Sequence, residues 1–194
     1  MSWTASLDLR YAFHQDFTLQ RTVAHANHVG PLRILQSLYP EGDAICHNVL
    51  VHPPGGLVGG DTLNISIQAE TGSHGLITTP GATRFYRSEN ELALQRTNIT
   101  LQGDSRLEWL PLEAICYSGC LAENRLTVQL APRAEFMGWD ITALVMFMVV
   151  FRFSSGANGC VAALLPRVAV GSVCQERFIS QGIEEGDHIC HLSF

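Results

Sequence analysis

The ten residues from His52 to Asp61 hold the densest set of special residue types in the chain, His-Pro-Pro-Gly-Gly-Leu-Val-Gly-Gly-Asp. The prolines fix an extended backbone. The two glycine pairs allow turns that other residues rarely make, at Gly55, Gly56, Gly59 and Gly60. Such a segment can cradle a ligand, line a passage or turn a corner. Asp61 is its single carboxylate, and two roles stay open for it: an acid that lines a passage, or a cap on a turn.

Phosphate binding is the familiar chemistry of glycine-rich segments, but the surrounding residues argue against it. A Walker motif requires a lysine, and all twelve basic residues of this chain are arginines. A dinucleotide site requires a helix after the glycines. Residues 62–69 instead alternate between apolar and polar side chains, as a strand does.

A second dense segment runs from Thr78 to Ser88 and combines hydroxyls, two arginines and two aromatic rings around a Pro-Gly turn. Arginine and tyrosine together are typical of interface hot spots. We therefore expect Arg84, Tyr86 and Arg87 to contact a partner. A solvated loop whose aromatic rings cap the core is an equally open interpretation.

The residues show no recognisable enzyme site. Glu108 and Glu113 are five residues apart, which would place them on opposite faces of a strand and argues against an acid–base pair there. The sequence contains no nucleophile elbow and no His-Glu-x-x-His motif. Its histidines are scattered, so we expect no tight metal site.

Composition narrows the partners and the compartment. A net charge of −6 disfavours nucleic acid, which requires a basic face. The first residues carry no export pattern, so we expect a cytoplasmic protein whose cysteines are reduced thiols. The apolar run at residues 141–151 is shorter than the roughly 20 residues that cross a bilayer, so no membrane association is expected.

Most of the chain has the period-two pattern of half-buried strands. It is clearest near Leu7 and Leu9, across residues 62–69, and at Leu126 and Val128. Turn signals separate these runs. We expect a mainly β fold of stacked, mostly antiparallel sheets with few short helices. Ser88 begins either a capped helix or a polar loop, and no internal repeat is obvious.

Seven stretches, in order, resemble the urease accessory protein family UreD, also called UreH. The most specific are the His52–Asp61 run and the Thr-Pro-Gly-Ala-Thr-Arg-Phe-Tyr-Arg-Ser run that ends at Ser88. The second of these runs lies in the matching stretch 77–88, and the full set also includes 6–10, 28–32, 39–41 with 46–47, 107–111 and 138–140.

The resemblance implies a non-enzymatic, mainly β maturation protein that binds apo-urease and recruits UreF and UreG for nickel insertion. No tightly bound cofactor is implied; nickel would be in transit along an internal polar passage. A passage suits oxygen ligands and water, because strong ligands would trap the ion. Candidate passage residues, by position in the family motifs and by charge, are Asp61, Thr83, Asp140 and Glu113.

The resemblance covers residues 1–144, which we expect to form a UreD-like β domain. After Asp140 the alternation fails, and residues 145–194 form a divergent tail of uncertain structure. A shifted reading frame, a truncated gene or a lineage-specific ending would each explain the change. The alternative function is therefore a nonfunctional remnant of a urease accessory protein.

Overall fold

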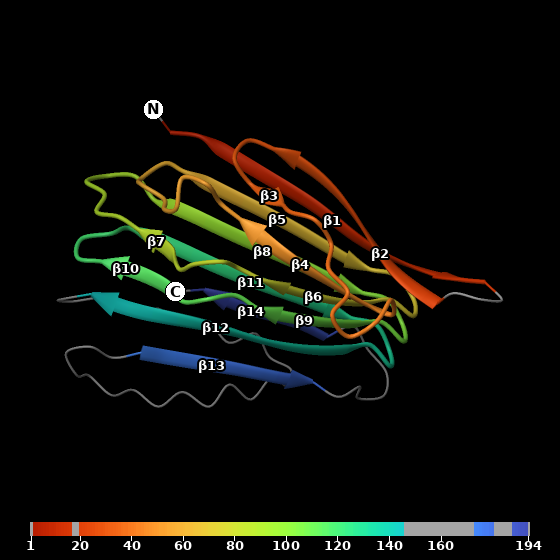
Figure 1. Ribbon diagram of the computed structural model, residues 1–194. Helices are drawn as coiled ribbons and strands as arrows, with labels where there is room; N and C mark the ends of the chain where they lie inside the picture. The colour runs from red at the N-terminus through yellow and green to blue at the C-terminus, as the bar shows by residue number, and fades with distance from the viewer. Residues whose placement is uncertain (1, 17–19, 146–172, 181–187, 194) are drawn as a thin grey trace.

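The computed structural model describes residues 2–16, 20–145, 173–180 and 188–193, which form two stacked β-sheets (Figure 1). The strands, in chain order, are β1 (Thr4–Gln15), β2 (Gln20–Val29), β3 (Arg33–Ile34), β4 (Ile45–Val51), β5 (Thr62–Ala69), β6 (His74–Thr78), β7 (Thr83–Phe85), β8 (Ala93–Leu101), β9 (Arg106–Leu110), β10 (Ala114–Tyr117), β11 (Ala122–Leu130), β12 (Glu135–Val145), β13 (Val173–Ser180) and β14 (His188–Ser193).

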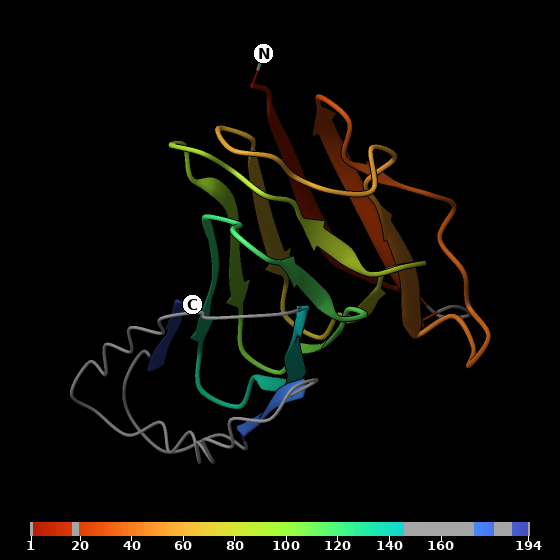
Figure 2. The same ribbon diagram turned by 90° about the vertical axis from the view of Figure 1, so that its left-hand side faces the viewer.

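One sheet has the order β14-β11-β8-β5-β1-β2. The other has the order β3-β4-β6-β9-β12-β10-β7, with β13 also paired to β12. In the perpendicular view the two sheets face each other as layers (Figure 2). The mainly β, stacked architecture expected from the sequence is confirmed.

The period-two pattern produces these strands because alternate side chains enter the space between the sheets. On β5, Leu63, Ile65 and Ile67 are buried, while the intervening side chains are more exposed. The predicted strand at residues 62–69 is confirmed with the same bounds. Leu7 and Leu9 on β1 and Leu126 and Val128 on β11 are also buried, as their alternation predicts.

The expectation of mostly antiparallel sheets is wrong. In the described residues eight strand pairs are parallel and four are antiparallel. The reason is that the short turns are corners between sheets. The chain leaves β5 in one sheet and enters β6 in the other, so β8 returns parallel to β5. Alternation reports burial of one face and carries no information on strand direction.

Three such corners stack on one another and define a structural repeat that the sequence did not reveal. β5, β8 and β11 begin at Thr62, Ala93 and Ala122, 31 and 29 residues apart. The corners are residues 70–73, 102–105 and 131–134, and each has a positive φ at its third residue, Gly72, Asp104 or Arg133. Backbone hydrogen bonds join successive corners. The arrangement is solenoid-like.

The described residues contain no helix, so the expected short helices are not found there. After Ser88 the chain forms the polar loop that was the alternative. The capping contact is still made, because Ser88 Oγ accepts a hydrogen bond from Glu91 N at 3.3 Å, but the backbone then enters β8. The apolar residues 146–151 of the expected tail lie outside the described residues.

The space between the sheets changes character along the strands. Next to the corners it is filled by apolar side chains such as Leu101, Leu107 and Leu130. Toward the opposite end, inward positions on β8, β11 and β12 are polar: Thr97, Asn124 and Asp140 are all buried. The fold therefore places a polar region inside one end of an otherwise apolar core.

Candidate functional site

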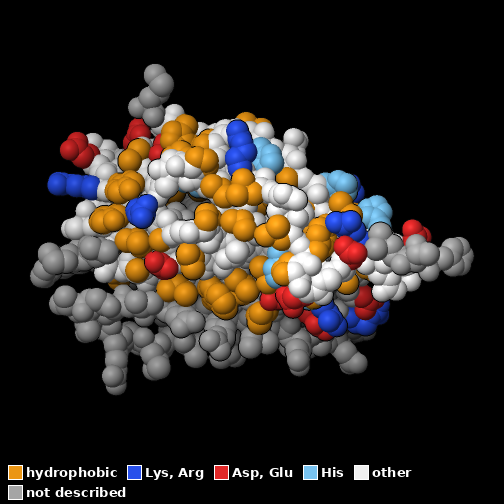
Figure 3. Space-filling model, viewed as in Figure 1, with side chains coloured by type: hydrophobic (Ala, Val, Ile, Leu, Met, Phe, Trp, Pro, Cys, Tyr) orange, Lys and Arg blue, Asp and Glu red, His pale blue; other side chains and the backbone are white. Residues whose placement is uncertain are grey.

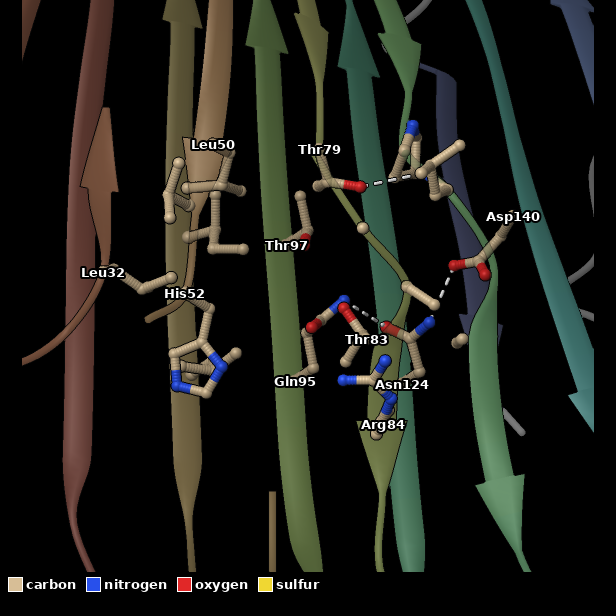
Figure 4. A pocket seen from close by; sticks show the side chains of 18 of the residues that line it. Leu32, Leu50, His52, Thr79, Thr83, Arg84, Gln95, Thr97, Asn124 and Asp140 are labelled. Atoms are coloured by element: carbon tan, nitrogen blue, oxygen red, sulfur yellow. Dashed lines mark hydrogen bonds between the residues drawn. The ribbon is translucent and has the colours of Figure 1, made fainter. Parts of the chain in front are cut away.

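A chamber of about 240 Å³ lies between the sheets at this polar end (Figure 4). One wall comes from β5, β8 and β11. The other comes from β4, β7, β9, β10, β12 and the loop that leads into β7. Its polar side chains are His52, Thr79, Thr83, Arg84, Gln95, Thr97, Asn124 and Asp140. The volume and polarity leave room for several water molecules.

A hydrogen-bonded row of side chains crosses the chamber from one sheet to the other. Gln95 Nε2 donates to Asn124 Oδ1 at 3.2 Å, between neighbouring strands β8 and β11. Asn124 Nδ2 then donates to Asp140 Oδ2 at 2.7 Å, across to β12. Figure 4 shows both bonds as dashed lines. This bond holds the buried carboxyl group of Asp140 in a fixed orientation.

Two buried atoms in the chamber wall have no hydrogen-bond partner among the described residues: Thr97 Oγ1 and His52 Nε2. Thr97 is only 2% exposed. Burial lowers the pKa of His52, and the charge of nearby Asp61 opposes that shift. The imidazole also packs against Trp3, with ring centroids 5.0 Å apart. Buried polar atoms are seldom unsatisfied, so these two atoms can bond to water or to an ion that enters the chamber.

Two of the four expected passage residues, Thr83 and Asp140, line the chamber. Asp61 does not. It is 1% exposed, and its two carboxylate oxygens accept hydrogen bonds from Trp3 N at 3.2 Å and Val58 N at 3.0 Å. That geometry is a turn cap. Glu113 also lies outside the lining, and its carbonyl oxygen accepts a hydrogen bond from Thr83 N at 3.0 Å.

The four motif glycines shape the backbone beside the chamber. Gly55 and Gly60 have φ of +73° and +87°, which favours glycine. Gly56 and Gly59 are required by close packing: a Cβ on Gly56 would collide with the Tyr86 ring, and one on Gly59 would lie 2.7 Å from the carbonyl oxygen of Glu91. Gly55 itself lines the chamber.

The two motifs that stand out in the sequence form a single unit in space. Leu57 N donates to Arg84 O at 2.7 Å, Tyr86 N donates to Leu57 O at 2.9 Å, and Gly60 N donates to Leu92 O at 3.1 Å. The glycine run therefore lies along the segment that carries the expected contact residues. Arg84 belongs to both regions, because it lines the chamber and is also exposed.

Exposed apolar and aromatic side chains gather next to this unit. Tyr86 is 39% exposed and stacks on Tyr117, with ring centroids 5.4 Å apart. Neighbouring segments add Val58, Leu92 and Leu121. We call these five residues, together with Arg84 and Arg87, the tyrosine patch. Figure 3 shows apolar side chains interspersed with arginines at the left-hand end of the molecule, over these loops.

Three chamber residues were missed from the sequence: Gln95, Thr97 and Asn124. A signal was present for Asn124, because it is in phase with the alternating apolar positions Leu126 and Val128 and must therefore point inward. Polar residues at inward positions of a strand mark either a satisfied network or a site.

Neither a metal centre nor a membrane span is found in the part of the chain that the structure describes. Among those residues, no group of three histidine, cysteine or carboxylate side chains converges. They also include no helix long and apolar enough to cross a bilayer. Among the cysteines whose side chains the structure describes, Cys46, Cys116 and Cys120 are free thiols.

Comparison with a family model and comparison with individual proteins lead to the same family. Residues 4–145 match the family described as UreD urease accessory protein. Proteins named urease accessory protein UreD are similar over long stretches. The one from Polaromonas sp. strain JS666 is 64% identical over 177 residues, covering 90% of this chain and 56% of that protein. The one from Variovorax paradoxus strain S110 is 72% identical over 144 residues, covering 74% of this chain and 51% of that protein.

The extent of these matches also bears on the expected tail. The family match ends at residue 145, next to the expected boundary at residue 144. The 177-residue match to the Polaromonas protein necessarily continues beyond that point. The chain spans about half the length of the curated relatives it matches.

Proposed function

Because the chain belongs to the UreD urease accessory protein family, we propose that it serves in the maturation of urease in the cytoplasm. Its role is structural rather than catalytic: it binds apo-urease, recruits UreF and UreG, and passes nickel to the urease site. The family match supports the assignment to urease. The chamber supports the transfer of an ion.

The observation that carries the transfer role is the row Gln95–Asn124–Asp140 inside the chamber. A divalent ion crosses a protein most easily on exchangeable oxygen ligands and water. The chamber offers one buried carboxylate, the hydroxyls of Thr83 and Thr97, and room for water. One carboxylate attracts the ion without the several strong ligands that would retain it.

This proposal routes nickel past Asp140 and Thr83 and gives Asp61 a different task. Asp61 ties the glycine run to Trp3 through the hydrogen bond at its Oδ1 atom. It thereby fixes the backbone that carries Gly55 to the chamber wall. In this proposal the glycine run fixes the backbone beside the nickel route, and Asp140 supplies the negative charge that attracts the ion.

The tyrosine patch is the proposed contact surface for UreF. It combines two stacked tyrosines, exposed aliphatic side chains and two arginines, and aromatic residues and arginine dominate hot spots. Arg84 reaches both the patch and the chamber, so a partner that covers the patch would lie at an end of the route.

Substitution of Asp140 by asparagine tests the route. The new side-chain amide keeps an oxygen that can accept the hydrogen bond from Asn124, while the negative charge that the carboxylate carries is lost. We expect the D140N variant, co-expressed with UreF, UreG and apo-urease, to form the complex but to lower the nickel content of urease severalfold. The matched control is Asp8→Asn, an exposed carboxylate on β1.

The measurements are pull-down of the complex and metal analysis of the purified urease. Normal nickel content with D140N would overturn the route through Asp140. If the unmodified chain captures neither UreF nor apo-urease, the maturation role is wrong and the chain is a nonfunctional relative.

A further inference from the structure

The chamber has an apolar side that the proposed transfer of an ion does not use. Its buried apolar lining consists of Leu32, Leu50, Leu63, Ile65, Trp109 and Leu126. Figure 4 shows Leu50 on one side of the chamber, and Thr83 and Arg84 on the other. Apolar side chains give a metal ion no ligand, whereas an apolar wall with a few converging polar groups is typical of a site for a small organic molecule.

Arg84 is the cationic side chain of the polar side. It lines the chamber and is also exposed, so its guanidinium group lies at a mouth of the chamber. In the part of the chain that the structure describes, this group forms neither an ion pair nor a hydrogen bond. A guanidinium group presents parallel N–H groups that match the two oxygens of a carboxylate. An anionic ligand can therefore pair with Arg84 without displacing a described partner.

Thr97 gives a second, independent indication of a ligand. Its side chain, on β8, lines the chamber and is 2% exposed. Its Oγ1 atom has no hydrogen-bond partner among the described residues. A buried hydroxyl is seldom left unpaired, so a molecule in the chamber that carries an acceptor oxygen would satisfy it.

The charges of the lining favour a ligand with a single negative charge. Arg84 supplies a permanent positive charge, and Asp140 is the one carboxylate among the described residues that line the chamber. A monocarboxylate balances the charge of Arg84, whereas a second negative charge on the ligand would be repelled by Asp140. A cationic ligand would be repelled by Arg84 at the mouth.

We propose that the chamber binds a short-chain aliphatic monocarboxylate, such as butyrate. The carboxylate pairs with Arg84 and accepts a hydrogen bond from Thr97 Oγ1, and the alkyl chain packs on the apolar side, against Leu50 and Leu63. A chamber of about 240 Å³ has room for such a molecule. Binding of this ligand does not depend on the proposed function in urease maturation, because it requires neither nickel nor another protein.

The test is an NMR titration at pH 7 in which the line width of the ligand's methyl protons reports binding to the full chain. We expect saturable binding of butyrate. Butyramide keeps the alkyl chain without the charge, and acetate keeps the charge with a shorter chain, so each should bind at least about tenfold more weakly.

Two variants test the contacts with the carboxylate. Arg84→Gln should weaken butyrate binding about tenfold, because hydrogen bonds between charged groups are lost. Its matched control is Arg125→Gln, an arginine outside the chamber lining, which should leave butyrate binding unchanged. Thr97→Val removes only the unpaired hydroxyl, so butyrate should bind about threefold more weakly while the free energy of unfolding stays equal or rises.

Three results would overturn the proposal. One is that the folded chain shows no saturable binding of butyrate. Another is that butyramide binds as tightly as butyrate, and the third is that Arg84→Gln and Arg125→Gln bind butyrate equally. Circular dichroism confirms that each variant is folded.

Discussion

At the scale of single residues, a buried carboxylate can either hold the protein together or act on something that enters it. The structure separates these cases by their partners. Asp61 accepts hydrogen bonds from two backbone N–H groups and lies outside the chamber lining, whereas Asp140 is held by the side chain of Asn124 and lines the chamber. The sequence singled out both residues but had no means of telling them apart.

Substitution of Asp61 by asparagine should destabilise the fold. The amide oxygen can replace one acceptor, but the amide N–H₂ would then face the second backbone donor, Val58 N or Trp3 N. Loss of a hydrogen bond to a charged group, with a buried donor left unpaired, costs about 2 kcal/mol. The measurement is the free energy of unfolding from urea titration.

Asp8→Asn is the control for this prediction, because an exposed substitution away from special features changes stability by less than about 0.5 kcal/mol. If Asp61→Asn unfolds at the same urea concentration as Asp8→Asn, the turn-capping role is wrong. A loss of nickel delivery with unchanged stability would instead restore Asp61 to the route.

Resemblance to a family and residue patterns recovered part of the site. Thr83 and Asp140 were named in advance and line the chamber. Gln95 and Thr97 were not, because a polar residue inside a strand is usually assigned to the solvent face. Their phase with Ile99 and Leu101 on β8 already indicates that they point inward, but the chamber that they line forms only where the opposite sheet faces them.

At the scale of elements, the glycine run and the segment after Phe85 pack against each other, and this contact accounts for the residue types in both. The glycines are needed because Tyr86, Ser88 and Glu91 pack directly on the run. The need for glycine cannot be understood from either segment alone. The sequence could therefore indicate only that the backbone of the glycine run adopts an unusual conformation. The backbone pairing of Leu57 with the segment at Phe85 brings the two segments into contact and so accounts for the glycines.

Gly59→Ala should therefore destabilise the protein although its φ does not require glycine. The new Cβ would lie 2.7 Å from the carbonyl oxygen of Glu91 and 3.0 Å from Ser88 Cβ. Overpacking of this kind costs about 2 kcal/mol. The matched control is Gly81→Ala, whose Cβ would have no neighbour within 4 Å.

Thermal unfolding followed by circular dichroism compares the two glycine variants. We expect a clearly lower Tm for Gly59→Ala and little change for Gly81→Ala. Equal shifts for both variants would mean that the packing of the glycine run on the following segment contributes nothing to stability.

At the scale of the whole molecule, the sequence predicted which segments are strands but not the order and direction in which those strands pair. Strands were recognised because burial leaves a period of two. Direction was not, because a corner between sheets and a hairpin within one sheet use the same turn residues. The repeat of about 30 residues was hidden because its corners share a backbone shape but not a sequence: Gly72, Asp104 and Arg133 occupy the same position.

The solenoid-like order also explains why chamber and patch lie together. The stacked corners close one end with apolar side chains, so polar inward positions and exposed loops collect at the other end. Arg84 connects them. Variants can nevertheless test the two proposed functions separately, since Asp140 is buried while Tyr86 and Arg87 are exposed.

We expect the double variant Tyr86→Ala with Arg87→Ala to bind UreF about thirtyfold more weakly, the effect of losing a hot spot worth roughly 2 kcal/mol. The chain should remain folded, because both side chains are exposed.

A matched control replaces another exposed apolar residue and arginine, Leu35→Ala with Arg125→Ala, and should bind UreF normally. Surface-bound chain titrated with UreF gives the affinities. Equal affinity for both double variants would place the UreF contact away from the tyrosine patch. If only the Tyr86→Ala/Arg87→Ala variant loses affinity for UreF, and D140N still captures UreF normally, then docking and ion transfer are separate functions of neighbouring sites.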